Sequence, residues 1–330
     1  MKITVRILKK LAALVLGLLV LSVLVFTMAR LAPTDPLQAY YGDRTEKMSA
    51  AEKEAARQRL GLNDSIPVQY VRWLKLAMQG DFGISYQYKQ PVTKVISQRI
   101  GNTLILGGLG FLLTFAGALA LGTLCAWYED RWPDKILCKL GTVSSCIPEF
   151  WLSLMLILIF SVTLRWLPSS GAYTIGRADD LLDRAVHLIL PITVVILSHL
   201  WYYAYLVRSK LLEETRREYV LLARAKGLSR KAVLLRHCLP AILPSYFSLM
   251  AISVPHILGG TYLVEAVFSY PGIGTLCYES ARYADYNLLM LLCLMTGGLV
   301  MVSALLGQAV SARIDPRLRS RDGKAVTAHE

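Results

Sequence analysis

The 330-residue chain has few acidic side chains, and few charges of any kind for its length. Asp and Glu total 23 against 36 Lys and Arg, and charged residues make up 18% of the sequence, whereas 55% is hydrophobic. A soluble domain usually has an apolar share of roughly 45–50%. The chain is therefore interpreted as a polytopic membrane protein. Because its basic residues are distributed between apolar runs and not gathered on one soluble face, no nucleic-acid partner is predicted.

Several signatures of catalysis and cofactor binding are missing from the sequence. The six cysteines have no Cys-x-x-Cys or His-paired spacing, so neither a disulfide framework, a zinc site nor any other cofactor is predicted. The chain has no P-loop and no phosphate-cradling glycine run, so it is not expected to hydrolyse ATP. No nucleophile with a neighbouring base is found, which argues against a membrane enzyme. Without an internal repeat, a secondary transporter or channel is the less favoured class.

Six apolar runs are each long enough to cross about 30 Å of hydrocarbon. Each is expected to be a helix, because backbone polar groups in lipid must be satisfied locally, and the expected fold is all-α. The predicted spans are Leu11 to Ala29, Thr103 to Trp127, Val143 to Leu164, Val186 to Val207, Ala241 to Val267 and Leu288 to Val310. Glu149 and Glu265 are candidates for a translocation path, since acids within a membrane are costly. A carboxylate bonded to backbone at the interface explains Glu265 equally well.

Lysine and arginine collect in alternate loops, and this pattern predicts the orientation. The basic segments are the N-terminus, the Tyr128 to Lys139 loop, the Arg208 to Arg236 loop and the tail from Arg313. The loops Pro168 to Ala185 and Phe268 to Tyr286 carry few cations. The positive-inside bias then places both termini in the cytoplasm. The loop 31–100 is assigned to the outside, because long loops translocate largely regardless of charge.

The long outer loop is predicted to form a small helical insertion. Ser49, with Glu52 three residues later, is the pattern of a capping box, and Gly61 is suited to end that helix. A second helix is expected over Val68 to Gln79. The predicted organisation is then an N-terminal transmembrane helix (1–30), an extracytoplasmic insertion (31–100), a transmembrane core (101–312) and a cytoplasmic tail (313–330).

Within the core, the basic loop 208–240 has a regular pattern of its own. Apolar and polar positions alternate with helical periodicity from Leu211 to Lys226, and Gly227 supplies the positive φ that ends the helix. Ser229 is suited to cap a second short helix, Arg230 to Cys238, before the chain returns to the membrane. The loop is therefore predicted to be a rigid elbow in the cytoplasm.

At these residues the chain resembles the inner-membrane permeases of ABC importers, in the dipeptide, oligopeptide and nickel branch. The family's loop has an Ala, a Gly four residues later and then a Leu-Pro pair, matched here by Ala223, Gly227 and Leu239-Pro240. The branch also reads Tyr-Val-x-x-Ala-Arg-Ala-Lys-Gly-Leu, which stands here from Tyr219 to Leu228. Two departures are Thr34, where the family often has Gly, and Pro240-Ala241, where Arg-Asn often follows the loop leucine.

Further pieces of the family pattern follow in the family's order along nearly the whole chain. They are Arg30-Leu31-Ala32-Pro33-Thr34-Asp35-Pro36, Leu60-Gly61-Leu62, Gly80-Asp81-Phe82-Gly83-Ile84-Ser85, Pro148-Glu149-Phe150-Trp151-Leu152, Trp166-Leu167-Pro168, Gly259-Gly260, Pro271-Gly272-Ile273-Gly274 and Asp315-Pro316-Arg317. The shared order, more than any single piece, supports the resemblance.

The resemblance implies a type I ABC importer permease fold with six transmembrane helices in the cytoplasmic (inner) membrane. It implies that the chain forms a heterodimer with a second homologous permease. Two ATP-binding subunits would dock from the cytoplasm, and an extracytoplasmic solute-binding protein would deliver cargo. The residues that would couple the ATPases to the membrane are Tyr219, Ala223, Ala225, Lys226, Gly227, Leu228, Leu239 and Pro240. The chain itself is then a transport subunit in contact with membrane lipid, not an enzyme.

The cargo that the resemblance implies is a di- or oligopeptide, with nickel or a nickel chelate as the alternative. Imidazole suits nickel, but His187, His199 and His256 lack helical ligand spacing. No convergent cluster of His, Cys or Met is evident from the sequence, so peptide is preferred.

Overall fold

The structure, a computed structural model, describes residues 2–32 and 35–314. These residues form α-helices and two short π-helices, with no β structure in the described ranges beyond an isolated bridge between Ile84 and Pro91. The chain divides into two compact units. One spans Met1–Asn102 and Pro271–Val302, and the other spans Thr103–Tyr270 with the described part of Ser303–Glu330. Residues 33–34, the Asp315-Pro316-Arg317 motif and the predicted tail from 315 onward lie outside the described residues.

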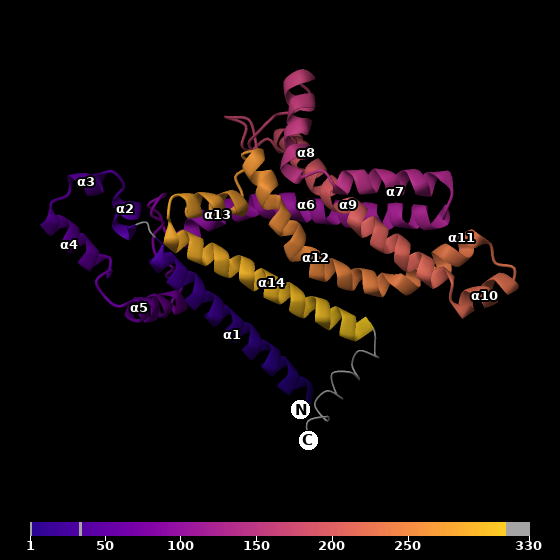
Figure 1. Cartoon of the computed structure of the whole chain (residues 1–330), viewed down its shortest axis with the longest axis horizontal. Helices are drawn as coiled ribbons and strands as arrows, with labels where there is room; N and C mark the ends of the chain where they lie inside the picture. The colour runs from indigo at the N-terminus through magenta and orange to yellow at the C-terminus, as the bar shows by residue number, and fades with distance from the viewer. Residues whose placement is uncertain (1, 33–34, 315–330) are drawn as a thin grey trace. The chain divides into compact units, whose positions relative to one another are not determined.

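Among the residues that the structure describes, five helices are long and apolar enough to cross a membrane (Figure 1). They are α1 (Lys2–Leu31), α6 (Val92–Trp127), α9 (Leu181–Thr215), α12 (Leu239–Val267) and α14 (Tyr286–Ile314). A sixth span arises when the bent pair of α7 (Trp132–Ser145) and α8 (Glu149–Leu156) is counted as one, with α8 continuing into the π-helix η1 (Ile157–Thr163). The predicted all-α, multi-pass fold is therefore confirmed.

Two expectations about the third span are wrong. The run Val143 to Leu164 is not one helix, because the chain bends by 100° between α7 and α8. Pro148 stands at the bend, lacks an N–H, and disfavours helical geometry at the residue before it. Residues Tyr128 to Lys139 are not a loop throughout, since α7 begins at Trp132. Pro133 lies in the first turn of α7, where its missing N–H costs nothing.

The first unit contains the predicted helical insertion. Its short helices are α2 (Pro36–Tyr41), α3 (Arg44–Lys47), α4 (Ala50–Arg59) and α5 (Ile66–Met78). The capping box before α4 is present: Glu52 N–H donates to Ser49 Oγ at 3.3 Å, and Ser49 N–H donates to Glu52 Oε2 at 2.7 Å. The Ser49 N–H and the Ser49 hydroxyl, which donates at 2.9 Å, both bond the Glu52 carboxylate and hold the pKa of Glu52 below its usual value. The predicted helices of the insertion are thus observed as α4 and α5.

In the same unit α5 packs on α1 through aromatic and polar contacts. The ring of Phe26 lies 5.4 Å from that of Tyr70, edge to face, and the hydroxyls of Ser22 and Tyr70 are 2.8 Å apart. The amphipathic periodicity of α5 places Tyr70 on the face that meets α1. The insertion is therefore attached to the first span by side-chain contacts as well as by the chain.

A further short helix, α13 (Ile273–Arg282), was not predicted, because it lies in the Phe268 to Tyr286 segment that was interpreted as a loop. Leu276 of α13 packs with the start of α6 and of α14 in a small apolar core. Hydrogen bonds attach the loop before α6 to the segment between α13 and α14. Buried Asp285 accepts hydrogen bonds from the Ser85 hydroxyl and from Gln87 N–H at 3.1 Å.

Tyr88 extends this polar attachment to α13. Its hydroxyl donates to Glu279 Oε2 at 2.6 Å. Burial of the ring, together with this acceptor, raises the pKa of Tyr88 to about 12. The phenol therefore remains a donor throughout the physiological pH range.

The second unit is built around α9. Its main apolar core includes Val194, Tyr203 and Leu211 of α9 and Ile257 of α12. Where α6 crosses α9, a side chain on Gly122 would come within 2.6 Å of the Ala204 carbonyl oxygen. Glycine is therefore required at this crossing, because the two backbones approach too closely for a Cβ.

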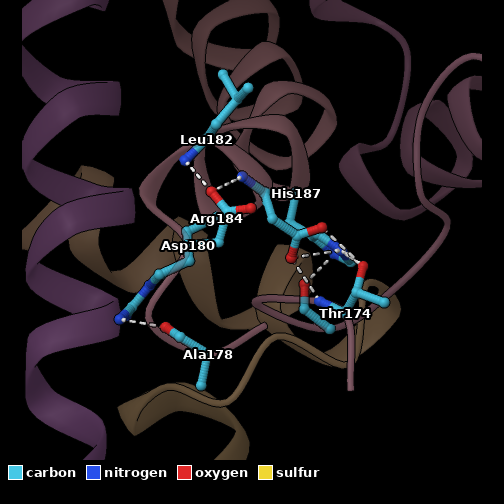
Figure 2. A network of polar contacts seen from close by, with 8 residues as sticks. Thr174, Ala178, Asp180, Leu182, Arg184 and His187 are labelled. Atoms are coloured by element: carbon cyan, nitrogen blue, oxygen red, sulfur yellow. Dashed lines mark hydrogen bonds and ion pairs between the residues drawn. The ribbon is translucent and has the colours of Figure 1, made fainter. Parts of the chain in front are cut away.

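The loop before α9 is fixed to the helix start by a polar network (Figure 2). Asp180 caps α9 by accepting from Leu182 N–H at 2.9 Å. Asp183 accepts from the N–H and hydroxyl of Thr174, at 2.6 and 2.7 Å. His187 Nδ1 lies 3.2 Å from the Gly171 carbonyl, so this nitrogen donates. His187 is thereby used to hold the loop in place.

Candidate functional site

The loop that the sequence singles out lies at one end of α9 and α12 (Figure 1). It consists of α10 (Glu218–Ala225), α11 (Arg230–Val233) and the π-helix η2 (Leu234–Cys238). The predicted single helix from Leu211 to Lys226 is wrong, because α9 ends at Thr215 and the chain turns at Arg216 and Arg217. Residues 230–238 are helical as predicted, but their second half has π-helical geometry and leads directly into α12.

A Schellman motif ends α10 and fixes the turn at Gly227. The N–H of Gly227 donates to the Arg224 carbonyl at 2.9 Å, and the N–H of Leu228 donates to the Ala223 carbonyl at 3.2 Å. Gly227 has φ +82, the left-handed conformation this motif requires. A Cβ here would meet no atom within 4 Å. Glycine is therefore needed for its backbone conformation and not for lack of space.

The next helix starts immediately after this turn. Ser229 caps α11, its Oγ accepting from Ala232 N–H at 3.3 Å. The predicted cap is confirmed. Only Gly227 and Leu228 separate the C-cap of α10 from the N-cap of α11. With its bonds satisfied on both sides, the turn has little freedom, and α10 and α11 form an elbow.

One face of α10 is buried and the other is exposed. Val220 and Ala223 are buried against the unit, whereas Leu221 and Leu222 are 62% and 58% exposed. The exposed leucines lie beside the exposed cations Arg224 and Lys226. An apolar pair with adjacent positive charge is a surface suited to contact another protein.

The remaining predicted coupling residues lie in this elbow and at the start of α12. Ala225 is exposed at the end of α10, and Leu228 follows the turn with 38% exposure. Leu239 is half-buried and Pro240 exposed where η2 passes into α12. Tyr219 donates its hydroxyl to Glu214 Oε1 at 2.9 Å, and burial with this acceptor raises its pKa. The structure thus brings all eight residues into one continuous segment, with Ala223 on the inner side.

The turn between α6 and α7 contacts both the chain just before α10 and the start of α11. Glu129 lies in that turn, with its carboxylate oxygens 3.5 Å from Arg216 at the start of the elbow and 3.8 Å from Arg230 in α11. Lys231 adds a cation–π contact, its Nζ lying 5.7 Å from the ring centroid of Trp127. Sequence reasoning treated these cations only as an orientation signal. The structure shows that three of them also hold the elbow to α6.

A buried ion pair supports the same end of α9. Arg208 donates to both carboxylate oxygens of Asp134, each at 2.7 Å, and Asp134 is 2% exposed. The Asp130 N–H, at 3.0 Å, and the Cys138 thiol, at 3.4 Å, also donate to Asp134. Thiols of Cys125 and Cys138 also lie near enough to Asp134 for the three to hold a cation. Because the guanidinium already bonds both oxygens, this cluster is explained as an anchor for α7 on α9.

The two candidate path carboxylates have different surroundings. Glu265 is 0% exposed and accepts a hydrogen bond from the Thr103 hydroxyl at 2.7 Å. Glu149, the first residue of α8, has its Oε1 3.9 Å from Nε2 of His199, and the ring of His256 lies 5.0 Å from that of His199. Sequence reasoning did not group Glu149, His199 and His256, because they lie on three different helices.

Comparison with protein families gives two matches that together cover most of the chain. Residues 118–320 match the family described as "Binding-protein-dependent transport system inner membrane component". Residues 3–107 match the family described as "Binding-prot-dependent transport system membrane comp, N-term". The elbow and the spans on both sides of it fall within the first match.

Curated relatives are similar over nearly their whole length. The chain is 33% identical to the "Oligopeptide transport system permease protein AppB" of Bacillus subtilis over 302 residues, covering 91% of this chain and 95% of the relative. It is 30% identical to the "Probable peptide ABC transporter permease protein y4tP" of Sinorhizobium fredii over 315 residues, covering 96% and 99%.

Among solved structures, a chain of the MetNI methionine ABC transporter in an inward-facing conformation has the same fold. The TM-score is 0.52 at 16% sequence identity, and the match covers 68% of this chain and 97% of that chain. At this identity the likeness concerns the fold alone.

Proposed function

Because the chain belongs to the family of binding-protein-dependent transport system inner membrane components, we propose that it is the permease subunit of an ABC importer for di- or oligopeptides. The observation that carries the proposal is the pair of full-length similarities to peptide permeases, with 91% and 96% of this chain aligned. The multi-pass helical fold and the relatives' names as permease proteins support a transport subunit.

We propose that the elbow couples the membrane spans to ATP-binding subunits. The coupling residues are Tyr219, Ala223, Ala225, Lys226, Gly227, Leu228, Leu239 and Pro240. Support comes from the exposed leucines of α10 and from the turn at Gly227, which is fixed by backbone bonds. A rigid connection transmits displacement, whereas a flexible loop would absorb it as conformational entropy. Nucleotide-driven motion of the ATPases would then move α9 and α12, which flank the elbow.

The assembly proposed around this chain has four further kinds of contact. A second, homologous permease completes the path as a heterodimer, two ATP-binding subunits dock at the elbow in the cytoplasm, and an extracytoplasmic solute-binding protein delivers peptide. Membrane lipid surrounds the spans in the inner membrane, with both termini on the cytoplasmic side. For the path itself we propose Glu149, and Glu265 stays a prediction.

Uptake by a strain lacking this gene tests the cargo. Labelled dipeptide and radioactive nickel are supplied in parallel, with and without the gene on a plasmid. Loss of dipeptide uptake that the plasmid restores, with nickel uptake unchanged, supports the proposal. Loss of nickel uptake alone identifies the alternative cargo, and unchanged uptake of both rejects the importer for either cargo.

A further inference from the structure

The second unit contains a cavity of about 920 Å³ between α6, α7, α9 and α12. Its wall combines aromatic side chains of α9, including Trp201, Tyr202 and Tyr205, with His256 of α12. The hydroxyl of Ser198 also belongs to the wall, and it is buried without a hydrogen-bond partner among the described residues. The cavity is therefore large and mostly apolar, with aromatic rings gathered on its α9 side and several polar groups, Arg208 among them.

The position of His256 indicates what this wall faces. His256 lies in the membrane-spanning helix α12 and is exposed in the isolated chain. An exposed imidazole at membrane depth is costly against lipid, because its outward-facing Nε2 would have no hydrogen-bond partner there. The wall is thus expected to face a water-filled path or the second permease. Both surroundings exist in a transporter whose path runs between two permeases.

Neighbouring side chains hold His256 in place. The Tyr203 hydroxyl lies 3.3 Å from Nδ1 of His256, and Tyr203 itself is 1% exposed. With this hydroxyl as donor, the neutral imidazole carries its hydrogen on Nε2. His256 then presents an N–H donor, and a donor recognises carbonyl and carboxylate oxygens.

Behind His256, the position of His199 is fixed by its own bonds. His199 Nδ1 lies 3.0 Å from the Val195 carbonyl, which only accepts, so Nδ1 carries hydrogen and Nε2 points toward Glu149. The approach of these groups to α12 depends on Gly260. A Cβ on Gly260 would lie 3.0 Å from His199 Cε1 and 3.5 Å from Glu149 Oε1. Glycine thus leaves room for the pair to pack behind the His256 ring.

We propose that this cavity is a peptide-binding chamber on the translocation path, in which the Nε2–H of His256 donates to a peptide carbonyl or carboxylate oxygen. The proposal rests on the peptide-importer function and adds the contact residue. Tyr203 selects the tautomer of His256, and the ring of His199, 5.0 Å away and edge to face, positions the His256 ring. The aromatic wall accepts side chains of many kinds by apolar contact, whereas every peptide offers the oxygens that His256 binds.

The test uses the complete transporter, with both permeases, the ATPases and the binding protein, in proteoliposomes. Uptake of labelled trialanine per ATP hydrolysed is measured for wild type, His256→Leu and His256→Gln. Loss of one hydrogen bond to a charged oxygen corresponds to about a tenfold effect. His256→Leu is expected to lower peptide uptake per ATP about tenfold, and His256→Gln, which keeps a donor, to recover most of it. Val162→Ala, exposed on η1 away from the cavity wall, is the matched control and stays at the wild-type ratio.

A second measurement does not depend on a substitution at His256. Cys146 is an exposed native thiol on the cavity wall, so excess trialanine is expected to slow its alkylation by a maleimide. Cys146→Ser identifies the labelled thiol. The proposed chamber is overturned if the wild type transports peptide but trialanine leaves the alkylation rate of Cys146 unchanged. It is also overturned if His256→Leu takes up as much peptide per ATP as the wild type. Failure of the wild type itself to transport any peptide overturns the proposed function as well, which separates the two outcomes.

Discussion

At the residue scale, the structure distinguishes two kinds of glycine in this chain. Gly122 and Gly260 lie at helix crossings where a Cβ would crowd a neighbouring helix. Gly227 and Gly176 have φ +82 and +86, and a Cβ added at either position would meet nothing within 4 Å, so only backbone strain opposes a side chain there. The second kind permits a substitution that strains one turn and leaves packing unchanged.

Gly227→Ala is therefore expected to lower stability modestly and coupling specifically. An alanine held at positive φ costs about 1 kcal/mol, because Cβ crowds the backbone. That cost corresponds to a decrease of about fivefold in the ratio of native to non-native turn, and so of up to about fivefold in the fraction of molecules with the native turn. Peptide-stimulated ATPase activity and uptake in proteoliposomes are expected to fall by a similar factor.

Gly176→Ala is the matched control for this substitution. It introduces the same strain in the loop before α9, far along the chain from the elbow. Both variants are expected to lower the thermal midpoint of the purified complex equally, and only Gly227→Ala to reduce coupling. Equal loss of coupling in both variants would show that the general stability of the protein, and not the turn in the elbow, determines the rate of peptide uptake.

At the scale of elements, the helix ends were predictable and the contacts between helices were not. Ser49, Gly227 and Ser229 define caps through bonds to residues a few positions away, and such local signals are present in the sequence itself. The break at Arg216–Arg217 was missed because helical periodicity continues across it. Glu129 was missed as a link between Arg216 and Arg230 because the three residues are distant in sequence and meet only when α6, α7 and α9 pack.

Glu129→Gln is expected to loosen the elbow without unfolding the protein. Glu129 is partly exposed, and ion pairs of this kind contribute about 0–1 kcal/mol. If the free energy of local opening falls by up to about 1 kcal/mol, the rate of amide hydrogen exchange in the elbow rises up to about fivefold. Hydrogen exchange by mass spectrometry is expected to show this increase in residues 218–238 and little change in α12.

The control for this substitution is Glu213→Gln, since Glu213 is 57% exposed and pairs with Lys210 at 2.9 Å within α9. It removes one acidic charge near the elbow, and the second ion pair of Glu213, at 3.9 Å, is with Arg217 only four residues along the chain, so Glu213 links no residues that are distant in sequence. Exchange in residues 218–238 is expected to stay at the wild-type rate in this variant. An equal rise in both variants would assign the effect to lost negative charge and not to the contact with Arg216 and Arg230.

At the scale of the whole molecule, hydropathy and charge predicted the all-α membrane fold, while packing determined the rest. The length of the apolar runs alone identified the spans α1, α6, α9, α12 and α14, because a helix needs about 20 apolar residues to cross a bilayer. The third span was predicted as straight, since hydropathy does not register the effect of Pro148 on the backbone. Similarly, the grouping of Glu149, His199 and His256 arises from the packing of α8, α9 and α12, for which a single sequence contains no signal.

The orientation of the molecule remains a prediction, and the coupling proposal depends on it. Ile175, 97% exposed in the loop before α9, is predicted outside, whereas Leu221, 62% exposed on α10, is predicted inside. In a Cys146→Ser background, a membrane-impermeant maleimide is expected to label Ile175→Cys in intact cells and Leu221→Cys only after permeabilisation. Lysine and arginine near the elbow disfavour its transfer across the membrane, which is the physical basis of this expectation. Labelling of Leu221→Cys in intact cells would place the elbow where no ATP-binding subunit can reach it, and the coupling role of Gly227 would then be rejected whatever the cargo.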